Sequence, residues 1–266
     1  MYFYTLLCYL LPIRGNIMNE TINQLFQRKS TRVFTAQTID PQTKNLIIDA
    51  AIQAPTAGNL HLYTILDITD PTLKTRLSET CDHQPFIATA PLVMIFCADV
   101  QRLYDGFNRL DELNVRQPGL GDLLLALSDA LIAAQNAVVA AHSLGIGSCY
   151  IGDILENCEE HRKLLHLPDY VVPIGMLVMG YPVKSQLDRK KPTRYRRTSM
   201  VRENIYQSYT EIELKTMFET QTSDAELPAI DFSTVLKGIY TRKFASDFAL
   251  EMDRSANAWI LPFLKK

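Results

Sequence analysis

The sequence predicts a layered domain of the α/β or α+β class, because helical and strand-like segments alternate along most of its 266 residues. Two strand-like segments, PLVMIFCAD (91–99) and YVVPIGMLVMGYP (170–182), are apolar throughout, as in strands covered on both faces. The run from 121 to 145 has a helical pattern and is apolar nearly all round, which places it in a core or a subunit interface. With 47% hydrophobic residues, the chain can bury a sizeable core as one large domain or two small ones.

The first third of the chain predicts three helices and one strand. Each helix is preceded by a side chain that accepts hydrogen bonds from the first turn, and in two of them proline takes the first helical position. We expect helices over 20–29, 40–54 and 70–81, capped by Asn19, Asp40 and Asp70, and a strand over 63–69.

The other segments are interpreted from their composition. They are a connector (83–91), a polar excursion or lid (100–121), a glycine-rich turn (145–152), a short helix (153–166) and a basic, extended segment (183–200). Residues 201–264 predict two or three amphipathic helices, with too little apolar content for a core of their own.

Three parts of the chain are expected to differ in role. Residues 1–17 are apolar, but they lack the basic start and cleavage site of a signal sequence and are too short to span a bilayer. We expect translation to start at Met18, which makes 1–17 a non-native or disordered extension. Residues 18–200 are expected to form the main domain, and 201–266 a helical extension that packs on the same domain or on a partner subunit.

Charge and cysteine content exclude several classes of protein. The net charge is −2 and the cations are concentrated locally, which argues against a nucleic-acid surface. The five cysteines form no CxxC pair, which argues against a disulfide framework or a zinc site and favours a reducing, cytoplasmic location.

The stretch RKSTRVF (28–34) places Arg28, Lys29 and Arg32 next to two hydroxyl residues. One interpretation is that these cations complement the C-terminal dipole of the preceding helix. The other is that the arginines, the Ser30 hydroxyl and the free N–H groups of a turn bind a phosphate dianion. This stretch alone leaves both interpretations open.

The glycine-rich stretch GIGSCYIG (145–152) matches neither of two common phosphate-binding motifs. The spacing from Gly147 to Gly152 fits GxxxxG, but the Lys and Ser/Thr of a P-loop do not follow. A helix precedes the stretch, whereas a strand precedes a dinucleotide fingerprint. Gly145 is expected to end that helix, and the other glycines indicate backbone that approaches something flat or bulky.

Side chains for acid–base or nucleophilic catalysis are not recognisable. The five histidines form no HExxH motif, and His142 on the long helix is expected to be packed or exposed. Cys149 lies between glycines, but spacing identifies no partner base for it. An anion site without such side chains favours a bound cofactor that carries the chemistry.

Five segments, by their order and spacing, resemble the FMN-dependent nitroreductase family. They are RKSTRVF (28–34), APTAGN (54–59), HQPFIATAP (83–91), DALIAAQNAVVAAHSLGIGSCYIGDI (129–154) and MGYP…KKPTRY (179–195). The resemblance implies an α+β fold of three layers, with a central mixed or antiparallel sheet flanked by helices. It also implies a C-terminal helical arm in an intertwined homodimer, and it makes 18–200 the FMN-binding domain.

The resemblance further implies where FMN binds. The phosphate and ribityl chain are expected at Arg28, Lys29, Ser30 and Arg32, with Arg194 or Lys191 returning to the phosphate. The loop that approaches the flavin of the partner subunit comprises Pro55, Thr56, Ala57 and Asn59. Gln84 is expected at the pyrimidine edge of the flavin, and the backbone of Tyr150, Ile151 and Gly152 near its ring. Many members have a Gln-Pro pair where this chain has His61-Leu62, so the contacts of His61 stay open.

The implied activity is that of an oxidoreductase. NADH or NADPH would reduce FMN and leave, and a nitroaromatic, quinone or similar electron-poor acceptor would then take the electrons in a ping-pong cycle. Tyr104, Phe107 and Arg109 in the 100–121 segment either hold the acceptor or merely cover the core. The alternatives are a flavin-binding protein without physiological turnover and a hydrolase that uses Cys149. No nucleic-acid or membrane partner is expected.

Overall fold

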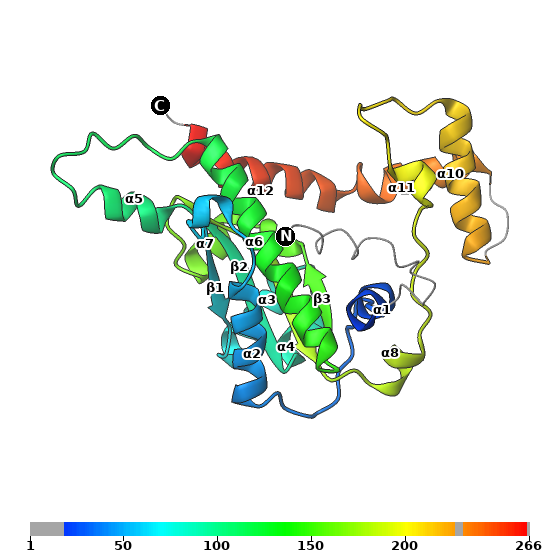
Figure 1. The fold of residues 1–266 in the computed structure, drawn as a ribbon, viewed down its shortest axis with the longest axis horizontal. Helices are drawn as coiled ribbons and strands as arrows, with labels where there is room; N and C mark the ends of the chain where they lie inside the picture. Colours follow the sequence, from blue (N-terminus) through cyan, green and yellow to red (C-terminus); the bar gives the residue numbers. More distant parts are fainter. Residues whose placement is uncertain (1–18, 227–230, 265–266) are drawn as a thin grey trace, which may run out of the picture.

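The computed structural model describes residues 19–226 and 231–264, and its centre is a four-stranded sheet (Figure 1). The strands are β1 (Tyr63–Asp67), β2 (Leu92–Asp99), β3 (Gly147–Ile151) and β4 (Val171–Gly180). They lie in the order β1-β2-β4-β3, and every neighbouring pair is antiparallel. All of β2 is buried, as its uninterrupted apolar run predicts for a central strand.

Helices surround this sheet and supply most of the remaining structure. Their bounds are α1 (Glu20–Gln27), α2 (Pro41–Ile52), η1 (Ala57–Asn59), α3 (Pro71–Thr80), α4 (Pro85–Thr89), α5 (Gln101–Phe107), α6 (Leu120–Ser143), η2 (Asp153–Leu155), α7 (Cys158–Leu164), α8 (Lys184–Asp188), α9 (Arg197–Met200), α10 (Glu211–Asp224), α11 (Phe232–Lys243) and α12 (Asp247–Leu264). The side chains of Asn19, Asp40 and Asp70 cap α1, α2 and α3, as predicted.

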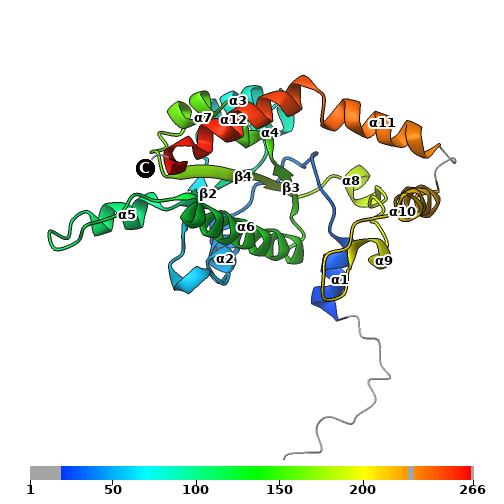
Figure 2. The same cartoon turned by 90° about the horizontal axis from the view of Figure 1, so that it is seen from above.

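Two helical layers enclose the sheet and make the fold a three-layer α+β structure, as expected. Figure 2 shows α2 and α6 on one side of the strands and α3, α4, α7 and α12 on the other. The first layer packs a row of α6 alanines, including Ala130, Ala133 and Ala137, against Met94 and Phe96 of β2. The second layer buries a separate cluster, which includes Leu77, Ile87, Trp259 and Phe263.

Helix α6 is the only described helix that is long and apolar enough to cross a bilayer by length and composition alone. Its alanine face is buried against the sheet, which explains its hydropathy as that of a core helix. Leu124, Leu125 and Leu131 on its other side are exposed. A subunit interface on that side stays a prediction.

Strand β3 was not expected, because the sequence interpretation placed a glycine-rich turn over 145–152. Gly145 does end α6, with φ at +74°, a conformation that favours glycine. The chain then pairs as a strand with β4, from Gly147 opposite Gly180 to Ile151 opposite Met176. Three glycines in eight residues hide the strand pattern, since glycine is depleted in strands.

Short helices occupy three segments that were expected to be irregular. Helix α4 lies in the connector over 83–91, α5 in the excursion over 100–121, and α8 and α9 in the basic segment over 183–200. Each has four to seven residues, too few for an apolar stripe to repeat.

The C-terminal helices divide into a packed part and an outer part. Helix α12 contacts α6, α7 and η2, and its Ser255, Trp259 and Phe263 are buried. Helices α10 and α11 contact each other and have no buried residue among those described (Figure 1). The domain boundary near 200 stays a prediction, and the extension predicted over 1–17 lies outside the described residues.

Candidate functional site

The cationic stretch is fixed against the start of β3. Helix α1 ends at Gln27, and the Thr31 N–H then donates to the Ser148 carbonyl at 2.9 Å. A side chain at Gly147 would collide with Thr31, because an added Cβ would lie 2.6 Å from its Oγ1. Glycine at 147 therefore lets the cationic stretch lie directly on the strand.

The Arg28 side chain is half-buried, and two of its guanidinium nitrogens lack a hydrogen-bond partner among the described residues. Its Nε and Nη2 are buried and have no hydrogen-bond partner among the described residues. The guanidinium lies 5.9 Å from the centre of the Tyr150 ring, and burial lowers its pKa. Buried donors without a partner are costly unless an acceptor joins them, so the two Arg28 nitrogens are a sign of an anionic ligand.

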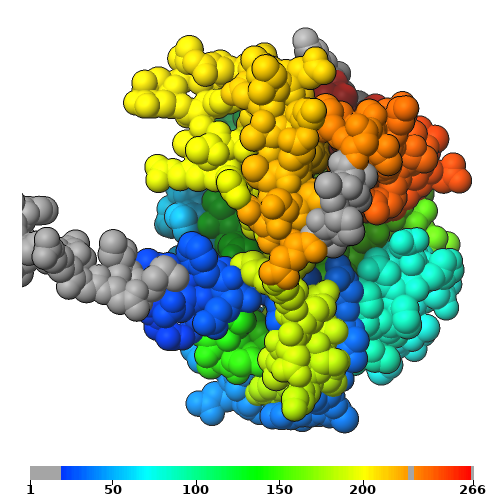
Figure 3. All heavy atoms as spheres, turned by 90° about the vertical axis from the view of Figure 1, so that its right-hand side faces the viewer, coloured from blue at the N-terminus to red at the C-terminus, as the bar shows by residue number. Residues whose placement is uncertain are grey.

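Two predicted phosphate ligands lie near Arg28. Burial lowers the pKa of Lys191, and repulsion from Arg194 and Arg28 lowers it further, so these three cations are close. The Lys191 ammonium donates to the Phe26 carbonyl at 2.6 Å, at the end of α1. Figure 3 shows α1 in blue and the α8 region in yellow-green side by side on this face. No carboxylate of the described residues contributes to the pKa shift of Arg28 or Lys191.

Lys29, Ser30 and Arg32 have partners within the protein, unlike the buried nitrogens of Arg28. The Lys29 ammonium donates to the carbonyls of Leu187, at 2.6 Å, and of Arg189, which ties the stretch to the C-terminal end of α8. Ser30 and Arg32 lie next to the Cys149 thiol, where they oppose the effect of burial on its pKa. Their contacts with a phosphate stay predictions.

The loop over 55–61 is anchored by a residue that the sequence analysis missed. Asp129 on α6 is only 2% exposed and accepts hydrogen bonds from the Ala57 N–H at 2.9 Å and the Leu62 N–H at 3.1 Å. Asp129 lies near the middle of α6, whereas Arg28 faces Gln135, Val139 and His142 in the second half of the helix. That the loop serves the partner's flavin stays a prediction. Asp129 was missed because an acidic residue in an apolar helix carries no sequence signal that separates a buried carboxylate from an exposed one.

The predicted ring contacts lie near the end of β3. Tyr150 donates to Gln135 on α6 at 3.4 Å, Ile151 is buried and Gly152 is exposed. The Gln84 amide donates to the Cys81 carbonyl at 2.9 Å, and the Cys81 thiol is near Asp153 of η2. The structure thus brings the Gln84 loop to the turn after Gly152.

The hydrolase alternative gains no support from the geometry of Cys149. Cys149 is 1% exposed, its thiol donates to the Tyr150 carbonyl, and burial raises its pKa. A nucleophilic thiol needs access and a lowered pKa. In residues 19–226 and 231–264, no group of three His, Cys, Asp or Glu side chains is placed to hold a metal ion.

An apolar cavity of about 450 Å³ lies under the predicted lid. Tyr104 and Phe107 line it, whereas Arg109 does not. Leu60, which belongs to the anchored loop, also lines the cavity. Arg116 pairs with Asp122 at 2.6 Å near the return of the lid segment to α6. A cavity with these walls suits a flat, apolar molecule.

Comparison with known proteins identifies the family. The model of the nitroreductase family matches residues 25–181, so the chain belongs to that family. It is 33% identical over 176 residues to an FMN reductase [NAD(P)H] of Bacillus subtilis, covering 66% of this chain and 70% of the relative. It is 34% identical over 197 residues to an oxygen-insensitive NADPH nitroreductase of Salmonella typhimurium, covering 73% and 78% of the two chains.

A solved structure agrees with this assignment. The structure of the NfrA1 nitroreductase from B. subtilis aligns with a TM-score of 0.74 and 26% identity. The alignment covers 89% of this chain and 98% of that one, so the fold match also includes most of the C-terminal helices.

Proposed function

We propose that this protein is an FMN-dependent oxidoreductase that uses NADH or NADPH to reduce nitroaromatics, quinones or similar electron-poor acceptors. The observation that carries the proposal is the half-buried Arg28 guanidinium, whose buried Nε and Nη2 have no partner among the described residues. A phosphate group at Arg28 would satisfy those donors and relieve the repulsion from Arg194 and Lys191. The names of relatives in the family, FMN reductase and NADPH nitroreductase, support the same cofactor and electron donors.

The charged residues fit the phosphate of FMN, and the residues near the end of β3 fit its ring. FMN, when bound, accepts hydride from the nicotinamide and transfers electrons to the acceptor. Arg28, Lys191 and Arg194 would bind the phosphate, while Gln84 and the backbone at Gly152 would orient the ring. Peptide N–H groups near the ring favour its anionic reduced form, since donors fixed in advance cost no reorganisation.

The acceptor would be held by the cavity under the lid. Tyr104 and Phe107 offer aromatic faces for a flat, electron-poor ring, and Leu60 provides an apolar wall. Because Leu60 belongs to the loop expected to reach the partner's flavin, we propose that a homodimer assembles each complete site. A cytoplasmic location is part of the same proposal.

Absorbance spectroscopy of the purified protein tests this function. We expect a flavin spectrum that NADH or NADPH bleaches within seconds, and that a nitroaromatic or quinone restores without oxygen. A ping-pong cycle further predicts parallel double-reciprocal lines when donor and acceptor are varied. A yellow protein that neither nicotinamide bleaches would instead be a flavin-binding protein without turnover. A colourless protein that binds no added FMN would refute the proposal.

A further inference from the structure

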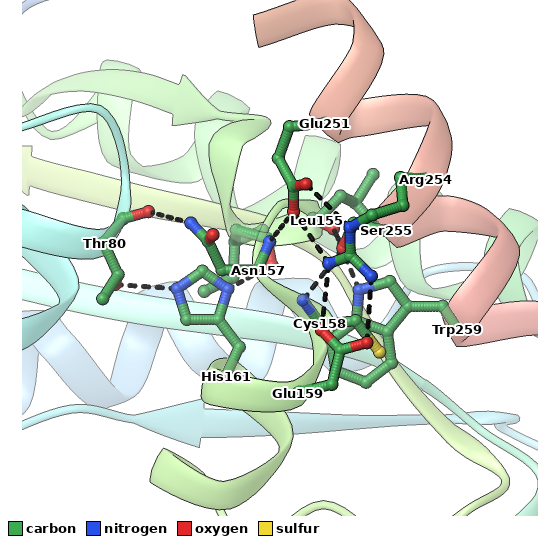
Figure 4. A network of polar contacts seen from close by, with 11 residues as sticks. Thr80, Leu155, Asn157, Cys158, Glu159, His161, Glu251, Arg254, Ser255 and Trp259 are labelled. Carbon is green, nitrogen blue, oxygen red and sulfur yellow. Dashed lines mark hydrogen bonds and ion pairs between the residues drawn. The ribbon is translucent and has the colours of Figure 1, made fainter. Parts of the chain in front are cut away.

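The turn that follows the predicted flavin contact at Gly152 is held from the C-terminal helix. The Leu155 carbonyl at the end of η2 accepts two hydrogen bonds from α12, from the Ser255 hydroxyl at 2.6 Å and the Trp259 indole N–H at 3.0 Å (Figure 4). The Ser255 hydroxyl also accepts from the Cys158 N–H at 2.9 Å. Ser255 and Trp259 are 0% and 1% exposed, so water does not compete for these bonds.

The same turn is closed by its own backbone. The Leu155 N–H donates to the Gly152 carbonyl at 3.0 Å, and the Glu156 N–H donates to the Asp153 carbonyl at 3.0 Å. Leu155 and Gly152 are therefore linked directly by one hydrogen bond. The contacts of α12 with Leu155 are in this way transmitted to the end of β3.

His161 on α7 bonds the carbonyl of Ile154, the residue between Asp153 and Leu155 in the same turn. Its Nδ1 is 3.0 Å from the Ile154 carbonyl, and its Nε2 is 2.8 Å from the Thr80 hydroxyl (Figure 4). A carbonyl only accepts, so Nδ1 carries the proton. Nε2 faces the Thr80 hydroxyl, which also lies 3.0 Å from the Arg76 carbonyl. The ring is fully buried, and burial lowers its pKa, in agreement with a neutral imidazole.

We propose that Ser255, Trp259 and His161 are positioning residues that fix the backbone at Gly152 against the flavin ring. The carbonyls from Gly152 to Leu155 all have donors, and three of those donors are buried side chains from α7 and α12. Backbone groups that stabilise a reduced ring must be held in place, because small errors in donor position lose much of the effect. This inference rests on the proposed function, and it assigns α12 a role in tuning the cofactor as well as in packing.

The exposed ion pairs of Arg254 on α12 are the control for the buried hydrogen bonds of Ser255 and Trp259. Arg254 lies next to Ser255 and pairs with Glu159 at 2.9 Å and with Glu251 at 2.8 Å. Its side chain is 49% exposed, and ion pairs at such sites contribute little to stability. If α12 only had to be attached, loss of Arg254 and loss of the Trp259 N–H would have similar consequences for the flavin.

The experiment compares the flavin-loaded wild type with Ser255→Ala, Trp259→Phe, His161→Gln and the control Arg254→Gln. Hydrogen exchange followed by mass spectrometry is measured over 150–157, together with the FMN midpoint potential and the dissociation constant of FMN. Trp259→Phe removes the N–H donor and keeps an aromatic ring, but it also leaves a space where the larger indole was buried, so Ser255→Ala is compared with it and the stability of each variant is measured by denaturant unfolding.

We expect exchange over 150–157 to accelerate roughly fivefold to tenfold in Ser255→Ala and Trp259→Phe, as for loss of one hydrogen bond. The ratio of affinities for reduced and oxidised FMN should fall up to about tenfold, which equals about 30 mV for a two-electron couple. Arg254→Gln should leave the potential unchanged and should affect exchange at most at Asn157, whose N–H donates to Glu251, a partner of Arg254.

A potential that stays at the wild-type value in Trp259→Phe, although exchange accelerates, would overturn the positioning role. Unchanged exchange in both α12 variants would overturn the restraint itself. These outcomes leave the proposed function intact as long as the wild type is bleached by a nicotinamide. A wild type that carries no FMN would instead refute the function and the role assigned to α12 together.

Discussion

The two ends of β3 have opposite polar chemistry. At its start, near Gly147, the cations Arg28, Lys191 and Arg194 lie close together, and the Arg28 guanidinium has buried donors without partners among the described residues. At its end, beyond Ile151, every carbonyl from 152 to 155 has a donor, and three of those donors are buried side chains.

This difference separates the binding part of the site from its scaffold. A buried polar group that lacks a partner has a cost that a ligand removes, whereas a fully bonded turn has no need of a ligand and gains rigidity. The start of β3 should therefore respond to mutations through ligand affinity. Its end should respond through backbone order and protein stability.

The largest expected effect is at Arg28. Arg28→Ala should weaken FMN binding by roughly 1.5–3 kcal/mol, because it removes a charge-assisted hydrogen bond to the phosphate. Arg32→Ala is expected to act in the same range if Arg32 also reaches the phosphate. Fluorescence titration of the apoprotein with FMN measures both, and riboflavin, which lacks the phosphate, should bind wild type and variants alike.

The matched control is Arg196→Ala, since Arg196 is already paired with Asp224 at 2.6 Å. Equal FMN affinities in Arg28→Ala and the wild type would reject the phosphate assignment.

Gly147→Ala should disturb the start of β3 through its backbone. The added Cβ would lie 2.6 Å from Thr31 Oγ1 and 2.7 Å from its Cβ, and such overpacking costs typically 1–3 kcal/mol of unfolding free energy. Because the cationic stretch would be pushed from the strand, FMN affinity should fall as well. Denaturant unfolding and FMN titration of the same samples measure the two effects. Gly121→Ala is the control, because no atom lies within 4 Å of its added Cβ. A fully stable Gly147→Ala would contradict the close approach.

The sequence predicted the layers of the fold better than it predicted the site. The apolar runs of β2 and β4 and the caps of α1, α2 and α3 carry local signals, so these elements could be assigned from short segments. Strand β3 could not, because its glycines have low strand propensity and its pairing with β4 is non-local. The family resemblance supplied the predicted flavin contacts, and their assignment stays a prediction.

The residues that support the site had no recognisable sequence signal. Four residues support the site: Asp129, His161, Ser255 and Trp259. Their hydrogen-bond partners are 67 or more residues away in the sequence, apart from the local bond of His161 to Ile154. A buried acidic residue or serine has no pattern that distinguishes it from an exposed one. Such roles appear only when the tertiary contacts are known.

A smaller effect is expected at the end of β3, where Glu156 is 7% exposed. Burial, followed by Asp153, Asp82 and Glu251, raises its pKa from 4.5 to about 7. The folded state therefore keeps a proton that the unfolded state releases, so stability falls as the pH rises from 4.5 to 7 and stays lower above 7.

Glu156→Gln removes this charge and should stabilise the protein at pH 8. The expected gain is only about 1 kcal/mol, because solvent screens part of the repulsion, and little difference is expected at pH 4. Thermal unfolding at both pH values measures this change, with Glu159→Gln as the exposed control. An equal gain at pH 4 and pH 8 would contradict the shifted pKa.

The smallest expected effect is a pH dependence of FMN affinity, caused by His142 near the start of β3. His142 lines a cavity with Arg28 and Lys29, and its pKa is lowered by burial and by repulsion from Arg28 and Lys191. A bound phosphate would offset that repulsion and raise the pKa of His142, so binding would be coupled to proton uptake below neutral pH. Wild-type FMN affinity should therefore rise twofold to fivefold relative to His142→Gln between pH 8 and pH 5.5. The comparison with His142→Gln cancels the ionisation of the FMN phosphate itself, which both proteins share. Parallel pH profiles for the two proteins would show that His142 does not sense the anion, and would place the phosphate away from the cavity that it shares with Arg28.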